Sequence, residues 1–171
     1  VLAQEWGAGR TRDEYLTEAL TVPTSFLVVS AERALAAEFQ QEAHARGVLG
    51  AIGADARVHK AIGQRTGLSA TTLARAFEIL DAKGAIDRVT PYSAKPAPKN
   101  RRYRVADPYL RFWLRFVGPY IDEIERGRGS VLLDRLAAAW TTYRGKAIEP
   151  VVAGSIQRML PDGRFRDAAR H

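Results

Sequence analysis

Residues 101–117 read RRYRVADPYLRFWLRFV and combine arginines with aromatic rings, two side-chain types that are common on nucleic-acid-binding surfaces. Arginine donates hydrogen bonds to phosphates and base edges, and aromatic rings stack on bases. The same stretch also fits a β-strand that leads into an amphipathic helix. In such a strand Arg102 and Arg104 share one face, while Tyr103 and Val105 share the other.

The aromatic part of this stretch has the spacing of a buried helix face. Asp107 suits an N-cap, and Pro108 suits the first helical position, where its missing N–H is not needed. The apolar residues that follow are three and four positions apart: Tyr109, Phe112, Trp113, Phe116 and Val117. We therefore predict that the aromatic residues build the core and that the arginines before them are the candidates for function.

Positive charge is concentrated just before this helix. Residues 88–104 contain six cations and no acid, namely Arg88, Lys95, Lys99, Arg101, Arg102 and Arg104. The whole chain carries +7, so this segment holds +6 and the remainder is close to neutral at +1. Such a concentration favours an anionic partner, although a solvated polar loop has the same composition.

Residues 56–83 predict two short helices joined by a tight turn. The first helix covers about 56–65 and the second about 70–83. Gly67 suits the turn because glycine has no Cβ, and Ser69 suits the N-cap of the second helix. Apolar residues of the two helices would pack together: Val58, Ile62, Leu73, Ala76, Phe77 and Leu80. This is the pattern of a helix-turn-helix.

The pattern changes to strand-like alternation after Gly84, which would end the second helix. AIDRVTPY and RRYRVAD predict two strands, and the loop SAKPAPKN between them is rich in proline and lysine. A helix-turn-helix followed by a hairpin with a basic tip is the winged-helix arrangement. We therefore expect a mainly α fold with a small β-hairpin, a winged helix-turn-helix flanked by helical segments.

Helical patterns flank this unit on its N-terminal side. Thr11 and Glu14 form a capping-box signature at the start of TRDEYLTEAL. A longer pattern runs from about Ala31 to Ile52, loosened at Gly47 and Gly50.

On the C-terminal side, Gly118-Pro119 would end the aromatic helix, and Ser130 would cap the next one. The predicted apolar face of that next helix is Leu133, Leu136, Ala137, Trp140 and Tyr143. After Gly145 we expect a separate final helix, bent or restarted at Pro150. Trp113 and Trp140 should be buried if this region packs onto the winged helix.

Several classes of protein are disfavoured. The chain has no cysteine, which excludes disulfides and thiolate zinc sites and favours a reducing compartment. No apolar stretch approaches the length of about 18 residues that a membrane helix needs, and there is no signal-peptide pattern. We expect a cytoplasmic protein without membrane contact. The first residue is Val, which leads us to expect a piece of a longer protein.

Catalytic and metal-binding constellations are also missing from the pattern. There is no GxxxxGK[ST] phosphate loop, and His44, His59 and His171 lack metal-ligand spacing. The acids Asp122, Glu123 and Glu125 stand beside Arg126 and Arg128, as helix-end charges commonly do. We therefore expect no catalytic residue, no metal and no cofactor within this stretch of chain.

Three segments, RYRVADPYLRFWLRFV, IERGRG and YRGKAIEPVV, resemble the C-terminal half of archaeal-type P-loop ATPases, over about residues 30–160. The resemblance implies lid helices of an AAA-like ATPase module at 1–30, a winged helix at 31–106 and, at 107–171, the opening of a nuclease-like domain that continues beyond the chain. It also implies an ATPase module that binds ATP and Mg²⁺ in the parent protein. Glu149 falls where nuclease-like folds place an early helical carboxylate, but a lone carboxylate cannot hold two catalytic metals, so we favour a charge at a helix start.

The leading hypothesis is a module that binds double-stranded DNA. Thr71, Thr72 and Arg75 would face the major groove, and Arg75 is the only long donor placed to read a base. The wing would supply phosphate contacts from Arg88, Lys95, Lys99, Arg101, Arg102 and Arg104. Glu78, one turn after Arg75, opposes the phosphate backbone, so we expect weak and mostly non-specific binding.

The competing hypothesis is a regulatory module that docks on the ATPase module of the parent chain or on a partner protein. The poor recognition helix favours docking, and the acid-free wing favours DNA. A fragment of a DNA-processing enzyme is compatible with both.

Overall fold

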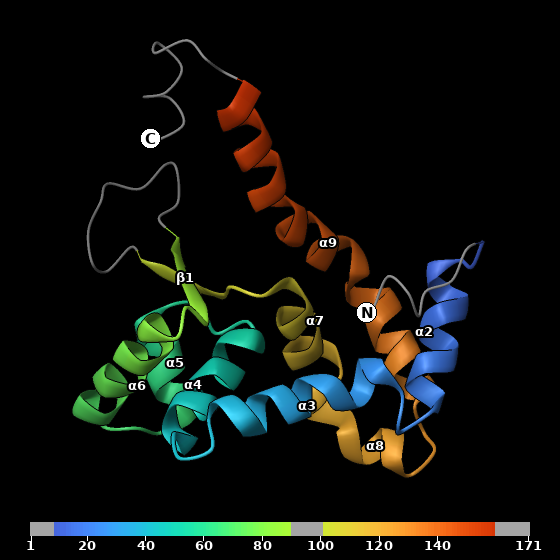
Figure 1. Cartoon of the computed structure of the whole chain (residues 1–171), viewed down its shortest axis with the longest axis horizontal. Coiled ribbons are helices and arrows are strands. Elements are labelled where there is room, and N and C mark those ends of the chain that lie inside the picture. Colours follow the sequence, from blue (N-terminus) through green and yellow to red (C-terminus); the bar gives the residue numbers. More distant parts are fainter. Residues whose placement is uncertain (1–8, 90–100, 160–171) are drawn as a thin grey trace.

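The computed structural model describes residues 9–89 and 101–159. The elements follow one another as α2 (Arg12–Thr21), α3 (Phe26–Glu38), α4 (Ala43–Gly53), α5 (His59–Thr66), α6 (Ala70–Ala82), β1 (Ile86–Val89), β2 (Arg102–Val105), α7 (Pro108–Phe116), the 3₁₀ turn η2 (Gly118–Tyr120), α8 (Ile121–Glu125) and α9 (Ser130–Met159). The fold is mainly α with a small β-hairpin, as predicted. In Figure 1 the helices α4, α5 and α6 and the hairpin gather at one end, α2 lies at the other, and α7 lies between.

The helix-turn-helix forms by the local signals in its sequence. Gly67 ends α5 at a φ of 66°, in the left-handed region that glycine enters without strain. Ser69 caps α6, and its side chain accepts a hydrogen bond from the Thr72 N–H. Gly84 ends α6 at a φ of 62° and turns the chain into β1. Ile62, Leu73 and other apolar residues of α5 and α6 are buried together, as the pattern predicts.

The hairpin has two chemically different faces. β1 and β2 are antiparallel, with Ile86 opposite Val105 and Asp87 opposite Arg104. Tyr103 and Val105 are buried against the helices, whereas Arg102 and Arg104 lie on the other face. The predicted division of this strand is therefore confirmed. A further hydrogen bond, from Tyr103 N–H to the Arg57 carbonyl (2.8 Å), ties β2 to the segment before α5.

The helix α7 joins the winged helix to the flanking helices. Asp107 caps it, since its carboxylate accepts from the Leu110 N–H at 2.6 Å. Trp113 is buried and its indole N–H donates to the Val28 carbonyl of α3 at 2.8 Å. The prediction that this helix has a core face is confirmed. Trp140 of α9 is only half-buried, so the expected burial holds fully for Trp113 alone.

The N-terminal helix boundaries differ from the prediction. The long pattern begins at Phe26 rather than Ala31, and it breaks at residues 39–42 rather than at Gly47 or Gly50. These two glycines lie inside α4, where packing holds the helix against their low propensity. The capping box of Thr11 and Glu14 forms as predicted.

The start of α5 is also corrected. Residues 56–58 are not helical, because the backbone there pairs with β2 through the Arg57 carbonyl. Val58 consequently points outward and is exposed, so it is not the core residue that the pattern predicts.

The C-terminal boundaries are corrected too. One helix, α9, runs through both Gly145 and Pro150, where two helices were expected. Ser130 is its first residue rather than its cap. Ala137, which the pattern placed on the core face, is exposed, whereas Leu132, which the pattern left out, is buried. Figure 1 shows the second half of α9 rising away from the other helices. None of the helices in the described ranges is long and apolar enough to span a membrane.

Candidate nucleic-acid interface

Most of the net positive charge of the chain lies between the start of α4 and the end of the hairpin, the part called the winged helix below. Residues 43–106 contain twelve Lys and Arg and four Asp and Glu, a net charge of +8 against +7 for the whole sequence. Ten of the twelve cations lie in the described part of this region, and Lys95 and Lys99 of the predicted wing lie outside it. Some of these ten cations form ion pairs with carboxylates of the fold, and the others do not.

Two of the predicted wing cations are engaged in ion pairs within the fold. Arg88 on β1 pairs with Asp81 near the end of α6. Arg104 on β2 pairs with Asp87, directly opposite on β1, at 2.5 Å. Cross-strand pairs of opposite charge stabilise a sheet. Both arginines therefore have a structural partner that competes with any phosphate.

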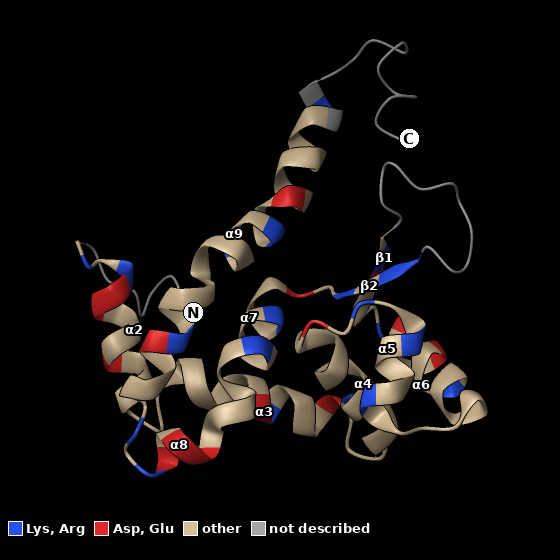
Figure 2. Cartoon of the chain, turned by 180° about the vertical axis from the view of Figure 1, so that it is seen from behind, with Lys and Arg blue, Asp and Glu red and all other residues tan. Residues whose placement is uncertain are grey.

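Five cations of the winged helix have no ion-pair partner among the described residues. They are Lys60 and Arg65 of α5, Arg75 of α6, Arg101 just before β2 and Arg102 within it. All five are exposed to solvent. We call these five residues the basic face. Figure 2 shows Lys and Arg on α5, α6 and β2.

An aromatic stack links the three elements that carry the basic face. The Phe77 ring of α6 stacks on Tyr103 of β2, with centroids 4.3 Å apart, and on His59 of α5, at 5.4 Å. Two cations of the basic face are sequence neighbours of these rings: Lys60 follows His59, and Arg102 precedes Tyr103. Because Phe77 and Tyr103 are buried, the stack sets how α6, the start of α5 and the hairpin lie relative to one another.

The exposed side of α6 offers few hydrogen-bond donors. Thr71 and Arg75 are exposed as predicted, and so is the opposing Glu78. Thr72 is half-buried, and its hydroxyl lies 2.9 Å from the Ser69 hydroxyl within the N-cap. The structure therefore brings Thr71 and Arg75 to the surface of the recognition helix and gives Thr72 a structural role.

We expect Ser69→Ala to lower the free energy of unfolding by about 1 kcal/mol, because the Thr72 N–H loses its acceptor at the start of α6. Chemical denaturation measures the change. Thr71→Ala is the matched control, since Thr71 is exposed in the first turn of the same helix and should change stability by less than about 0.5 kcal/mol. Equal losses in both variants would contradict the capping role.

Sequence reasoning missed Lys60 and Arg65. It considered only the acid-free segment 88–104, although residues 56–77 are also free of acids and contain Arg57, Lys60, Arg65 and Arg75. The second acid-free run was the available signal, and it falls on the helix-turn-helix itself.

Other candidate groups lie apart from this face. Among the residues that the structure describes, no three His, Asp or Glu are grouped to hold a metal ion. Glu123 forms an ion pair with Arg128 at 2.6 Å, which lowers the pKa of the Glu123 carboxyl through the hydrogen bond from Arg128. His59 belongs to the aromatic stack, His44 is exposed, and His171 lies outside the described residues. Glu149 is exposed on α9.

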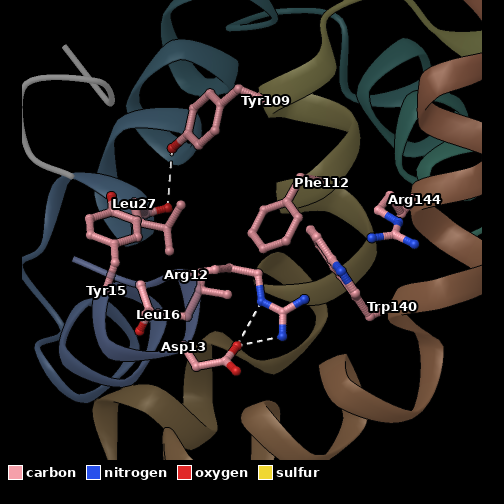
Figure 3. A pocket seen from close by; sticks show the side chains of 10 residues that line it. Arg12, Asp13, Tyr15, Leu16, Leu27, Tyr109, Phe112, Trp140 and Arg144 are labelled. Atoms are coloured by element: carbon pink, nitrogen blue, oxygen red, sulfur yellow. Dashed lines mark hydrogen bonds and ion pairs between the residues drawn. The ribbon is translucent and has the colours of Figure 1, made fainter. Parts of the chain in front are cut away.

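A hollow of about 970 Å³ lies between α2, α3, α7 and α9 (Figure 3). Its walls are largely aromatic and aliphatic, and Arg12 lies over the Trp140 ring at 4.5 Å. Arg12 also pairs with Asp13. The residues that line it are Thr11, Arg12, Asp13, Tyr15, Leu16, Leu27, Tyr109, Phe112, Trp140 and Arg144. None of them belongs to the basic face.

Comparison of the chain with protein-family models, with curated proteins and with solved structures finds no match. The resemblance to archaeal-type ATPases therefore stays a prediction.

Proposed function

We propose that this chain is a DNA-binding module that holds double-stranded DNA through the basic face. The observation that carries the proposal is the set of five exposed cations without an ion-pair partner among the described residues, on elements joined by the aromatic stack. The fold pairs the other five cations in the described part of the winged helix with carboxylates and leaves these five for an anionic partner.

In this mode α6 enters the major groove and the hairpin contacts the adjacent backbone. Arg75 is the long donor of α6 that can reach a base edge, and Thr71 adds one hydroxyl. Glu78 lies one turn further along and repels phosphate. Lys60, Arg101 and Arg102 supply phosphate contacts, which set affinity without reading sequence. The module therefore binds duplexes with little sequence preference.

The test is the salt dependence of binding to a labelled random-sequence duplex. Each phosphate neutralised contributes about −0.9 to the slope of log K against log salt, so the three phosphate contacts of Lys60, Arg101 and Arg102 predict about −2.7. Replacing Lys60, Arg101 and Arg102 with alanine should reduce the slope by about 2.7 and weaken binding on the order of a hundredfold at 0.1 M salt.

The matched control replaces Arg126, Arg128 and Arg135 with alanine. It removes the same charge from the α8 and α9 region, at the opposite end of the fold in Figure 2. The control should keep the parent slope. If the two triple variants lose affinity equally, net charge alone drives binding and the basic face is not the interface. If the chain without substitutions does not bind the duplex at low salt, the proposal is overturned.

One observation favours the alternative, a regulatory module that docks on a protein. Four apolar residues in the second half of α9 are 46 to 63% exposed, namely Ile148, Val151, Val152 and Ile156. Contiguous exposed apolar residues mark interaction surfaces more often than chance. If the chain without substitutions fails to bind DNA, the docking function is the next one to test, with an ATPase module as the first candidate partner.

A further inference from the structure

A second group of cations lies behind the hairpin, where the winged helix meets α7 and α9. Its members are Arg57, Arg104, Arg111, Arg115 and Lys146, and we call them the junction cluster. They come from four separate parts of the chain, the segment before α5, β2, α7 and α9. Figure 2 shows Lys and Arg on β2, α7 and α9. Arg104 lies on the face of β2 that points away from Tyr103 and α6.

Two carboxylates pair with members of this cluster. Asp55 bridges two of them, at 2.7 Å from Arg57 Nε and 3.2 Å from Lys146 Nζ. Asp87 pairs with Arg104 at 2.5 Å. Five cations therefore share two carboxylates, which leaves an excess of three positive charges. Asp55 itself has a φ of 78°, a conformation that non-glycine residues seldom adopt.

The two arginines of α7 have no carboxylate partner among the described residues. Arg111 donates from Nε to the Val105 carbonyl at 3.0 Å and from Nη2 to the Ala106 carbonyl at 3.3 Å. Arg115 donates from Nη1 to the Ala54 carbonyl at 3.0 Å. Each guanidinium thus keeps donors that no described acceptor uses. In the described part of the chain no fully buried side-chain nitrogen lacks a partner, so these remaining donors reach solvent.

The environment of Arg111 disfavours the positive charge of its guanidinium. Burial lowers the pKa of its guanidinium, and the neighbouring charges of Arg104 and Arg57 lower it further. Tyr143 of α9 faces the same space, and burial raises the pKa of its hydroxyl, so it stays protonated. Half-buried like charges that are close together destabilise a fold unless a counter-charge joins them.

We propose that the junction cluster is an anion site that binds a phosphate group, either of a nucleic-acid backbone or of a free polyphosphate. Several guanidinium and ammonium groups that converge from different elements match the oxygens of a phosphate. The carbonyl contacts of Arg111 and Arg115 explain their orientation, but they do not neutralise the excess charge. The site uses none of the five residues of the basic face, although Arg102 and Arg104 share one face of β2, so separate variants test the two proposals.

The first experiment measures the melting temperature of the chain in sodium pyrophosphate against sodium chloride of equal ionic strength. Binding to the folded state should raise the melting temperature with the logarithm of the pyrophosphate concentration, by about 5 to 10 °C at 100 times Kd. Lys146→Gln and Arg111→Gln should each weaken pyrophosphate binding at least tenfold. The Lys146 side chain is 40% exposed, so this variant remains informative if Arg111→Gln fails to fold.

Arg144→Gln is the matched control. It makes the same charge change two residues away on α9, but Arg144 lines the aromatic hollow on a different side of the helix. It should bind pyrophosphate like the parent chain. The proposal is overturned if pyrophosphate adds nothing beyond ionic strength, or if Arg144→Gln loses as much affinity as Lys146→Gln.

A duplex-binding arm separates the two sources of phosphate. If Lys146→Gln weakens binding of the labelled random-sequence duplex and pyrophosphate competes with it, the site takes the nucleic-acid backbone. If duplex binding is unchanged while pyrophosphate binding is lost, the site takes a free polyphosphate. Both outcomes support the site. The variant that replaces Lys60, Arg101 and Arg102 tests the basic face and should still bind pyrophosphate. The two proposals can therefore fail independently of each other.

Discussion

Gly129→Ala should be among the most damaging single substitutions in the chain. Gly129 is buried before α9, and a Cβ there would collide with the Leu20 carbonyl oxygen and lie 2.7 Å from the Leu20 carbonyl carbon. Both atoms are backbone of α2, so no side-chain rotation relieves the collision. The two helices must separate, and we expect the free energy of unfolding to fall by about 3 kcal/mol.

Urea denaturation of the variant and its parent measures this loss as a lower midpoint with an unchanged slope. Gly145→Ala is the control, because it adds the same methyl group within α9, where nothing lies within 4 Å. It should raise stability by up to about 1 kcal/mol, since alanine is the better helix former. A small effect at both positions would mean that α2 and α9 do not pack as described.

The elements that sequence reasoning predicted well are those with a local physical cause. Thr11, Ser69 and Asp107 cap helices through contacts three residues away, and Gly67 and Gly84 take positive φ at helix ends. These signals act within a few residues, so they can be recognised in the amino-acid sequence alone. The helix-turn-helix and the hairpin were predicted correctly for this reason.

The errors fall where distant parts of the chain decide the outcome. Val58 appears apolar and helical by pattern, but pairing of the Arg57 carbonyl with Tyr103 keeps the segment extended. Gly145 and Pro150 do not divide α9, although each disfavours a helix interior. Local propensity is weak, and contacts that are remote in sequence override it.

The candidate interface was predicted in part for a similar reason. Arg101, Arg102 and Arg75 are exposed cations as the sequence suggested. The sequence did not reveal that Asp81 and Asp87 pair with Arg88 and Arg104, because ion pairing depends on how strands and helices meet. A count of charges along the chain treats all cations alike, whereas the fold divides them into paired and unpaired ones.

The aromatic stack offers the second large effect, at Phe77. This residue is buried, and Phe77→Ala removes a ring that touches both His59 and Tyr103. Deleting a buried phenylalanine side chain costs about 3 to 5 kcal/mol, so we expect a marked loss in chemical denaturation. Phe77→Leu keeps most of the apolar volume and should cost less than about 1.5 kcal/mol. A loss in Phe77→Ala no larger than in Phe77→Leu would show that the ring is not a core element.

Phe77→Leu also separates packing from positioning. The variant keeps every cation of the basic face but loses both ring stacks, so the hairpin and α5 are less firmly held against α6. An aromatic pair contributes about 0.5 to 1.5 kcal/mol beyond burial, and we expect duplex affinity to fall about 2- to 10-fold with the salt slope unchanged. Parent-like affinity in the folded variant would mean that the stack only fills the core. A reduced affinity at constant slope is what a positioning role requires, because the same number of phosphates is neutralised by cations that are less well placed.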